Sequence, residues 1–96
     1  MPHLKWSTRS LNDMQRLHRF LAYKDQDAAS RAIKSIRYGV RVLAHQPQAG
    51  RPIDDMEPEY REWLIDFGNS GYIVRYRIDN DTIILLAIRH QKEADF

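Results

Sequence analysis

The side chains that could do chemistry gather in the last third of the sequence. Arg89 and His90 follow a strongly apolar run, where an imidazole beside a guanidinium could act as a general acid or base. The alternative is that His90 is a plain polar residue at the end of a buried strand. None of the four histidines has a second histidine or a carboxylate at a helical metal-ligand spacing, and cysteine is absent. The sequence therefore predicts no metal centre and no cofactor.

Arginines in or beside the predicted strands form a second candidate group, which consists of Arg51, Arg61, Arg75, Arg77 and Arg89. Arg75 and Arg77 are two residues apart in a predicted strand and must share one of its faces. A guanidinium pair can bind a phosphate or a carboxylate bidentately. The alternative is cross-strand pairing with neighbouring acidic residues, which contributes little at an exposed site.

The strands that position these residues end the chain. Tyr72–Ile78 alternates apolar residues with Ile73, Arg75 and Arg77, which is typical of a half-buried strand. Ile83–Ile88 is apolar on both faces and suits an interior strand. The turn-forming residues Asp79-Asn80-Asp81 join the two strands. Tyr60–Phe67 predicts a further strand, with Trp63, Ile65 and Phe67 on one face, followed by a turn over Gly68–Gly71.

The first half predicts a short strand around Leu4 and Trp6, then two helices. Ser7 or Thr8 caps a helix over Thr8–Lys24, and a second helix follows over Asp27–His45. The expected buried positions are Leu11, Met14, Leu17 (or His18) and Leu21 in the first helix, and Ala29, Ile33, Ile36, Val40 and Leu43 in the second. Pro47–Pro58 is expected to be a loop. The whole predicts one α+β domain, residues 1–96, with an antiparallel helix hairpin on a three-stranded antiparallel meander.

Composition and charge limit the partners. The 43% apolar and 29% charged residues are typical of a globular protein. No segment approaches the roughly 18 apolar residues of a membrane span, and the N-terminus lacks a signal-peptide core, so we expect a cytoplasmic protein with no membrane partner. Residues 1–46 carry a net charge of +6 and residues 47–96 carry −4. The basic half could meet nucleic acid or an acidic protein segment, or could be a solvated helix surface.

Four segments, in order, resemble the ParE-type toxins. His45–Pro52 resembles the loop after their second helix, and Glu59–Glu62 the start of their second strand. Gly71–Ile78 and Ile88–Glu93 resemble their final hairpin. The order of the predicted elements is similar to the RelE/ParE toxin fold over essentially the whole chain.

This resemblance implies the toxin half of a type II toxin–antitoxin pair, with growth inhibition and plasmid stabilisation as its effects. Such a toxin is held inactive by a cognate antitoxin whose disordered segment folds around it. The complex commonly represses its own operon, so we expect the chain to meet operator DNA only indirectly, through the antitoxin.

The resemblance leaves two activities open. ParE-like members poison DNA gyrase, whereas RelE-like members cut mRNA on the ribosome with lysines on the second strand and an arginine after the Gly-Tyr of the third. Here Leu64 and Asp66 stand in that second strand, Ile73 follows Gly71-Tyr72, and Phe96 stands where a tyrosine might be. The sequence therefore resembles the ParE-like toxins more than the RelE-like ones, and on this interpretation the protein is not an enzyme.

On the ParE reading, the residues expected to contact the target are Arg75, Arg77, Arg89, His90 and Lys92. On the RelE reading, the ribosome and mRNA are the partners, His90 is the acid or base, and Arg61, Arg75 and Arg89 surround the phosphate. A third reading is a domain that keeps the fold but has lost toxicity.

Overall fold

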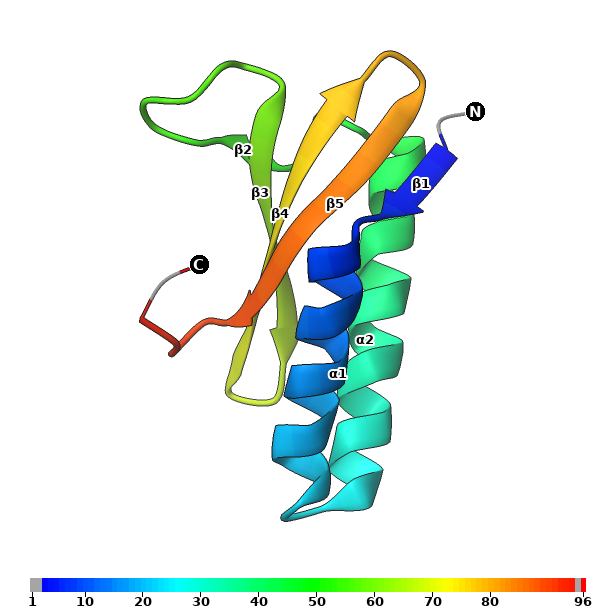
Figure 1. Ribbon diagram of the computed structural model, residues 1–96, viewed down its shortest axis with the longest axis vertical. Coiled ribbons are helices and arrows are strands. Elements are labelled where there is room, and N and C mark those ends of the chain that lie inside the picture. The colour runs from blue at the N-terminus through cyan, green and yellow to red at the C-terminus, as the bar shows by residue number, and fades with distance from the viewer. Residues whose placement is uncertain (1–2, 95) are drawn as a thin grey trace.

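Two antiparallel helices lie against one face of a five-stranded sheet (Figure 1). The computed structural model describes residues 3–94 and 96, and the statements below concern these residues. The elements are β1 (His3–Trp6), α1 (Thr8–Ala22), α2 (Gln26–His45), β2 (Arg51–Pro52), β3 (Tyr60–Phe67), β4 (Ser70–Asp79) and β5 (Thr82–His90). The α+β architecture and the helix hairpin predicted from the sequence are confirmed.

The strands lie in the order β1-β5-β4-β3-β2. The antiparallel meander β3-β4-β5 is as predicted, and β1 pairs parallel to β5, so β5 is an interior strand as expected. The prediction of a three-stranded meander after the helices is incomplete, because Arg51 and Pro52 form the short edge strand β2 against β3 inside the expected loop. Proline is tolerated there because an edge strand need not donate every backbone N–H.

The helix boundaries follow their caps. The Ser7 hydroxyl accepts a hydrogen bond from the Ser10 backbone N–H (3.0 Å) and begins α1, as predicted. The second helix begins earlier than the predicted Asp27, since the Asp25 carboxylate accepts from the Ala28 N–H (3.1 Å) and caps it. The first helix correspondingly ends at Ala22 rather than at Lys24.

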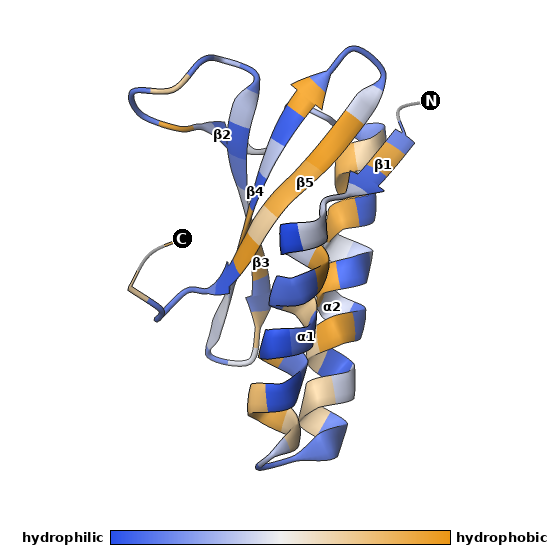
Figure 2. Ribbon diagram, in the orientation of Figure 1, coloured by the Kyte–Doolittle hydropathy of each residue, from blue (hydrophilic) through white to orange (hydrophobic). Residues whose placement is uncertain are grey.

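Apolar side chains from β3, β4, β5 and the two helices form one core. Figure 2 shows β5 as a largely apolar strand beside the two helices. The buried residues of α2 agree with the predicted seam, except that Ile33 is only partly buried and packs at its edge. The prediction that Leu11 is buried is wrong, because this side chain is 50% exposed. The face of α1 toward the sheet is centred on Ser10, Met14 and Leu17, and Leu11 lies about a quarter turn away from it.

A β-bulge interrupts the alternation of side chains in β5. Tyr76 pairs with Leu85 and Arg75 pairs with Ala87, so Leu86 is the extra residue. Beyond the bulge the faces are exchanged, which turns Arg89 away from the helices and His90 toward them. Within the described part of the chain no helix is both long and apolar enough to cross a membrane.

Candidate functional site

The sheet face opposite the helices, here called the outer face, carries three of the predicted arginines. Arg75 lies opposite Glu62 on β3, Arg77 opposite Tyr60, and Arg89 opposite Ile73, so all three share that face. The helices cover only the other side of the sheet (Figure 1). Arg75 and Arg77 therefore share a face as the period of the strand predicts.

Phe96 lies over two of these arginines. The Arg75 guanidinium carbon is 4.5 Å from the ring centroid and that of Arg89 is 5.1 Å, both within cation–π range. Arg89 Nη1 also donates to the carbonyls of Glu93 (2.8 Å), His90 (3.3 Å) and Gln91 (3.3 Å). The chain after β5 is thereby tied to the outer face, and we call Arg75, Arg89 and Phe96 the arginine–phenylalanine cluster.

Carboxylates offset part of the charge on this face. Glu62 accepts from Arg75 Nη2 (3.0 Å) and lies 3.7 Å from Arg51 Nη2, and Asp79 lies 3.7 Å from Arg77 Nη1. The Nε atoms of Arg75 and Arg89 are shielded from solvent and have no hydrogen-bond partner within the described residues. An anion could reach these two N–H groups only by displacing what covers them.

His90 occupies the opposite side of the sheet. Its ring packs edge-on against Tyr72, with centroids 5.3 Å apart and planes at 84°. The Lys92 backbone N–H donates to His90 Nδ1 (3.0 Å), which leaves Nε2 to carry the proton of the neutral ring. The backbone N–H of His90 donates to Glu93 Oε1 (2.7 Å). The histidine thus lies away from the arginine–phenylalanine cluster.

A groove of about 820 Å³ opens beside His90, between α1 and the ends of β4 and β5. We call it the α1–β5 groove. Its lining is Arg16, Leu17, Phe20, Leu21, Lys24, Phe67, Tyr72, His90, Lys92 and Glu93. Burial, and secondarily the charge of Glu93, raise the pKa of Tyr72, so its hydroxyl is neutral at physiological pH. Sequence reasoning missed Phe20, whose signal is a large aromatic residue between Arg19 on α1 and Lys24 just after the end of that helix.

Arg61 has a structural position at the far end of the sheet. Its Nη1 donates to the carbonyl of Gly50 (2.8 Å), while the Tyr76 hydroxyl donates to the Pro47 carbonyl (2.7 Å) and accepts from the Gly50 N–H (2.9 Å). These bonds hold the segment after α2 against β3 and β4.

The four residues of the RelE-like set are therefore not gathered. Arg61 on β3 lies opposite Tyr76 of β4, and His90 on β5 lies opposite Tyr72 of the same strand. Tyr72 and Tyr76 are four residues apart, which corresponds to about 13 Å along a strand. Arg75 and Arg89 lie together on the other face. Nowhere in residues 3–94 and 96 do three histidine, aspartate or glutamate side chains converge to hold a metal ion.

The family model for the ParE toxin of the type II toxin–antitoxin system, parDE, matches residues 4–95. Toxin RelE3 of Caulobacter vibrioides is 31% identical over 93 residues, covering 97% of this chain and 98% of that protein. Toxin RelE1 of the same organism is 32% identical over 87 residues, covering 91% and 90%.

Solved structures agree in fold. A chain of the chromosomal ParDE system from Pseudomonas aeruginosa aligns with a TM-score of 0.72 and 22% identity, covering 94% of this chain and 96% of that one. The RelBE2 toxin–antitoxin complex from Mycobacterium tuberculosis gives 0.60 and 23%, covering 95% and 100%. The helix hairpin and the mixed sheet are thus a fold shared with chains of these two toxin–antitoxin systems. The chain belongs to the ParE toxin family of type II toxin–antitoxin systems.

Proposed function

We propose that this chain is a ParE-like inhibitor of DNA gyrase, acting in the cytoplasm and neutralised by a cognate antitoxin. The observation that carries the proposal is the separation of His90 and Arg61 from the arginine–phenylalanine cluster. A ribonuclease needs an acid or base within hydrogen-bond reach of the phosphate that its cations hold. A protein that acts by binding has no such requirement.

The surface at the end of β5 has the chemistry of a protein contact. Phe20 is 66% exposed at the α1–β5 groove, and Lys24 and Lys92 lie at the same groove. An apolar anchor surrounded by charged groups is a common arrangement in protein interfaces. Because Arg89 and His90 are adjacent but face opposite sides of the sheet, the end of β5 joins this groove to the outer face. The target surface that we propose comprises Arg75, Arg77, Arg89, His90 and Lys92.

One observation favours a second candidate, a ribosome-dependent mRNA endoribonuclease. The arginine–phenylalanine cluster places two guanidinium groups beside an aromatic ring, and such a set could hold a phosphate and stack a base. Two similar proteins carry RelE names. Glu62 weighs against this candidate, because its carboxylate lies 3.0 Å from Arg75 and would repel a phosphate there.

The test is a supercoiling assay with purified gyrase and antitoxin-free protein. We expect loss of supercoiling with accumulation of cleaved DNA, and a weaker effect for the Arg89→Ala, His90→Ala variant. Arg31→Ala, an exposed change on α2 that does not line the α1–β5 groove, serves as the matched control and should act as the wild type does.

Two other outcomes would rule out gyrase as the target of this chain. If gyrase is unaffected while the protein arrests growth and mRNA is cut on translating ribosomes, the endoribonuclease is the correct function. If cells grow normally when the chain is expressed without antitoxin, the fold has been kept and toxicity lost.

A further inference from the structure

The helix wall of the α1–β5 groove lies where α1 continues past the end of β5. Figure 1 shows the C-terminal part of α1 extending beyond the last residue of that strand. Phe20, on this part of the helix, is 66% exposed, and Leu21 is half-buried. Together with Leu17 they form an apolar wall along the groove.

The opposite wall is a row of three rings on the sheet. The centroids of Phe67 and Tyr72 are 6.1 Å apart, and those of Tyr72 and His90 are 5.3 Å apart. All three residues line the groove, whose volume of about 820 Å³ is that of a typical small-molecule site. The groove therefore has the size and the largely apolar lining that a small organic ligand requires.

The Tyr72 hydroxyl is a buried polar group without a partner. The side chain is 2% exposed, and its hydroxyl makes no hydrogen bond to any of the described residues. Buried tyrosine hydroxyls ordinarily have a partner, as the Tyr76 hydroxyl does with the Pro47 carbonyl and the Gly50 N–H. Because Tyr72 lines the groove, its hydroxyl is available to a ligand there.

The charged groups of the groove leave positive charge unpaired. Glu93 is committed, because one carboxylate oxygen pairs with Arg16 and the other accepts from the backbone N–H of His90 (2.7 Å). Lys24 and Lys92 form no salt bridge within residues 3–94 and 96, although both line the groove. His90 adds the N–H of its Nε2, since its Nδ1 already accepts from the Lys92 backbone (3.0 Å). The free polar groups are thus hydrogen-bond donors and cations, which complement an anion.

We propose that the α1–β5 groove binds an amphipathic carboxylate, a small molecule with one carboxylate on an unbranched apolar chain. The carboxylate would accept from the Tyr72 hydroxyl and from His90 Nε2, beside the ammonium group of Lys92. The apolar chain would lie between the wall of α1 and the ring of Phe67, where it is removed from water.

The shape of the groove favours a chain over a compact ion. From Arg16 to Lys24 the groove follows α1 for about 12 Å. An occupant of this length would cover His90 and Lys92 of the proposed target surface. That consequence rests on the proposed function, whereas the binding itself does not.

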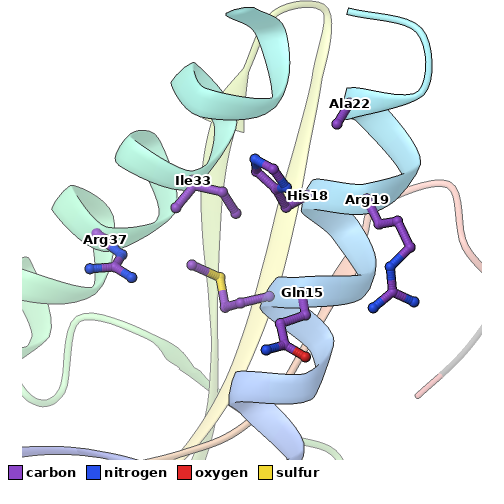
Figure 3. Close-up of a pocket in the computed structure, with 7 residues that line it drawn as sticks. Gln15, His18, Arg19, Ala22, Ile33 and Arg37 are labelled. Carbon is purple, nitrogen blue, oxygen red and sulfur yellow. The ribbon is translucent and has the colours of Figure 1, made fainter. Parts of the chain in front are cut away.

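A second hollow, on the face of α1 that is turned toward α2, lacks this combination. It has a volume of about 460 Å³, and Figure 3 shows Gln15, His18 and Arg37 around it. These polar side chains are all exposed, so water already satisfies them. No buried hydroxyl is among the residues that line this hollow.

The experiment is titration calorimetry of the antitoxin-free chain with decanoate, below the concentration at which decanoate forms micelles. We expect saturable binding of one decanoate per chain. Octanoate, which lacks two of the methylene groups, should bind about fifteenfold more weakly, since each buried methylene contributes about fourfold. Octanol, which keeps that shorter chain without the charge, should bind about fivefold more weakly than octanoate. Absence of saturable binding of decanoate, or equal affinities for octanoate and octanol, would overturn the proposal.

Tyr72→Phe tests the hydroxyl. The variant keeps the ring and loses no hydrogen bond within the described residues, so it should unfold at the same urea concentration as the wild type at neutral pH. Its affinity for decanoate should fall by about tenfold or more, because the carboxylate loses a donor. Tyr38→Phe is the matched control, since it removes an exposed hydroxyl on α2 outside the groove, and should bind as the wild type does. Equal affinities in the two variants would overturn the proposal.

Lys92→Gln provides a second test at an exposed residue, where the change does not disturb the core. Its affinity for decanoate should fall by about two- to fivefold, the effect of losing an exposed ion pair. Lys34→Gln removes the same charge from an exposed position of α2 outside the groove and should have no effect. Equal affinities in these two variants would likewise count against the proposal.

NMR of the isotope-labelled chain locates the ligand. Decanoate should shift the amide signals of Leu17 and Phe67, which lie on the two walls of the α1–β5 groove. Shifts confined to Gln15, His18 and Arg37 would place decanoate in the hollow of Figure 3 and would overturn the proposal. Because every readout here is ligand binding, a failure of the gyrase assay does not affect it.

Discussion

The Arg75 guanidinium carbon lies 4.5 Å from the centroid of the Phe96 ring, which joins the segment after β5 to the middle strand of the sheet. Arg89 reaches the same ring from the neighbouring strand at 5.1 Å. The ring lies against both guanidinium groups, and the Glu62 carboxylate pairs with that of Arg75 alone among the two. The guanidinium groups of Arg75 and Arg89 are thus already covered, and an anion must compete with Phe96 for them.

The first prediction concerns this ring. Phe96→Ala should loosen the segment after β5, because a cation–π contact contributes about 0.5–1 kcal/mol at an exposed site. The Glu93 N–H, which donates to the His90 carbonyl (3.0 Å), should exchange with solvent about two- to fivefold faster. Hydrogen exchange measured by NMR checks this result. Phe96→Tyr keeps the ring and should exchange at the wild-type rate; equal rates in all three proteins would contradict the prediction.

A second prediction separates structure from catalysis at Arg61. Arg61→Ala should lower the free energy of unfolding by about 1–2 kcal/mol, since the Gly50 carbonyl loses its charged donor. Toxicity per folded molecule should be unchanged. Urea unfolding and a growth assay at equal soluble protein measure the two effects. A variant of native stability that has lost RNA cleavage would instead place Arg61 in a phosphate site.

The third prediction is a pH dependence set by Tyr76. Burial raises the pKa of this hydroxyl above its ordinary value of 10.0, although the Gly50 hydrogen bond and the Arg61 charge oppose the shift. The folded state therefore favours the protonated form. The stability that results is present below the unfolded pKa, near 10.0, and is lost as the pH rises through the higher folded pKa.

Tyr76→Phe tests this dependence. The variant should be less stable at neutral pH by about 1–2 kcal/mol, because it loses the bond to the Pro47 carbonyl and leaves the Gly50 N–H unpaired. It should also lose less stability than the wild type above pH 10; the pKa of Tyr72 is raised in the same direction, so some dependence remains. Unfolding curves between neutral and alkaline pH give both numbers. Parallel curves for the two proteins would rule the assignment out.

The fourth prediction concerns the bulge in β5. The Ile88 N–H lies beyond the bulge and donates to Asp13 Oδ2 (2.8 Å) on α1. Asp13→Ala should cost about 1–3 kcal/mol in the free energy of unfolding, because that N–H loses its acceptor. Asp13→Asn keeps an oxygen acceptor and should cost less, as measured by urea unfolding. Equal costs would mean that the charge of Asp13, through Arg9 and Arg16, matters more than the hydrogen bond.

The periodicity of apolar residues is sufficient to predict the helices and the meander, because the residues that each of these elements buries recur at regular intervals. Tyr72, Val74 and Tyr76 alternate in β4 as expected and are buried. The short strand β2 left no such signal, because two residues have no period.

The positions of the candidate site residues were harder to predict. Strict alternation from Leu85 would place Arg89 on the helix side and His90 outside, and the bulge at Leu86 reverses both. An all-apolar run such as Ile83–Ile88 hides a bulge, since either register buries apolar side chains. The separation of His90 from Arg75 and Arg89 therefore depends on one extra residue that composition and spacing do not reveal.

The parallel pairing of β1 with β5 joins the two ends of the described chain. Ser7 donates to the Leu86 carbonyl across 79 residues of sequence, and Leu4 lies opposite Ile83. During synthesis from the N-terminus, β1 must wait without its partner until β5 has emerged, and contacts this distant in sequence form slowly. Residues 8–45, which form both helices, are made before β3, β4 and β5. The apolar faces of the helices therefore remain without the sheet that buries them until the last strands have emerged.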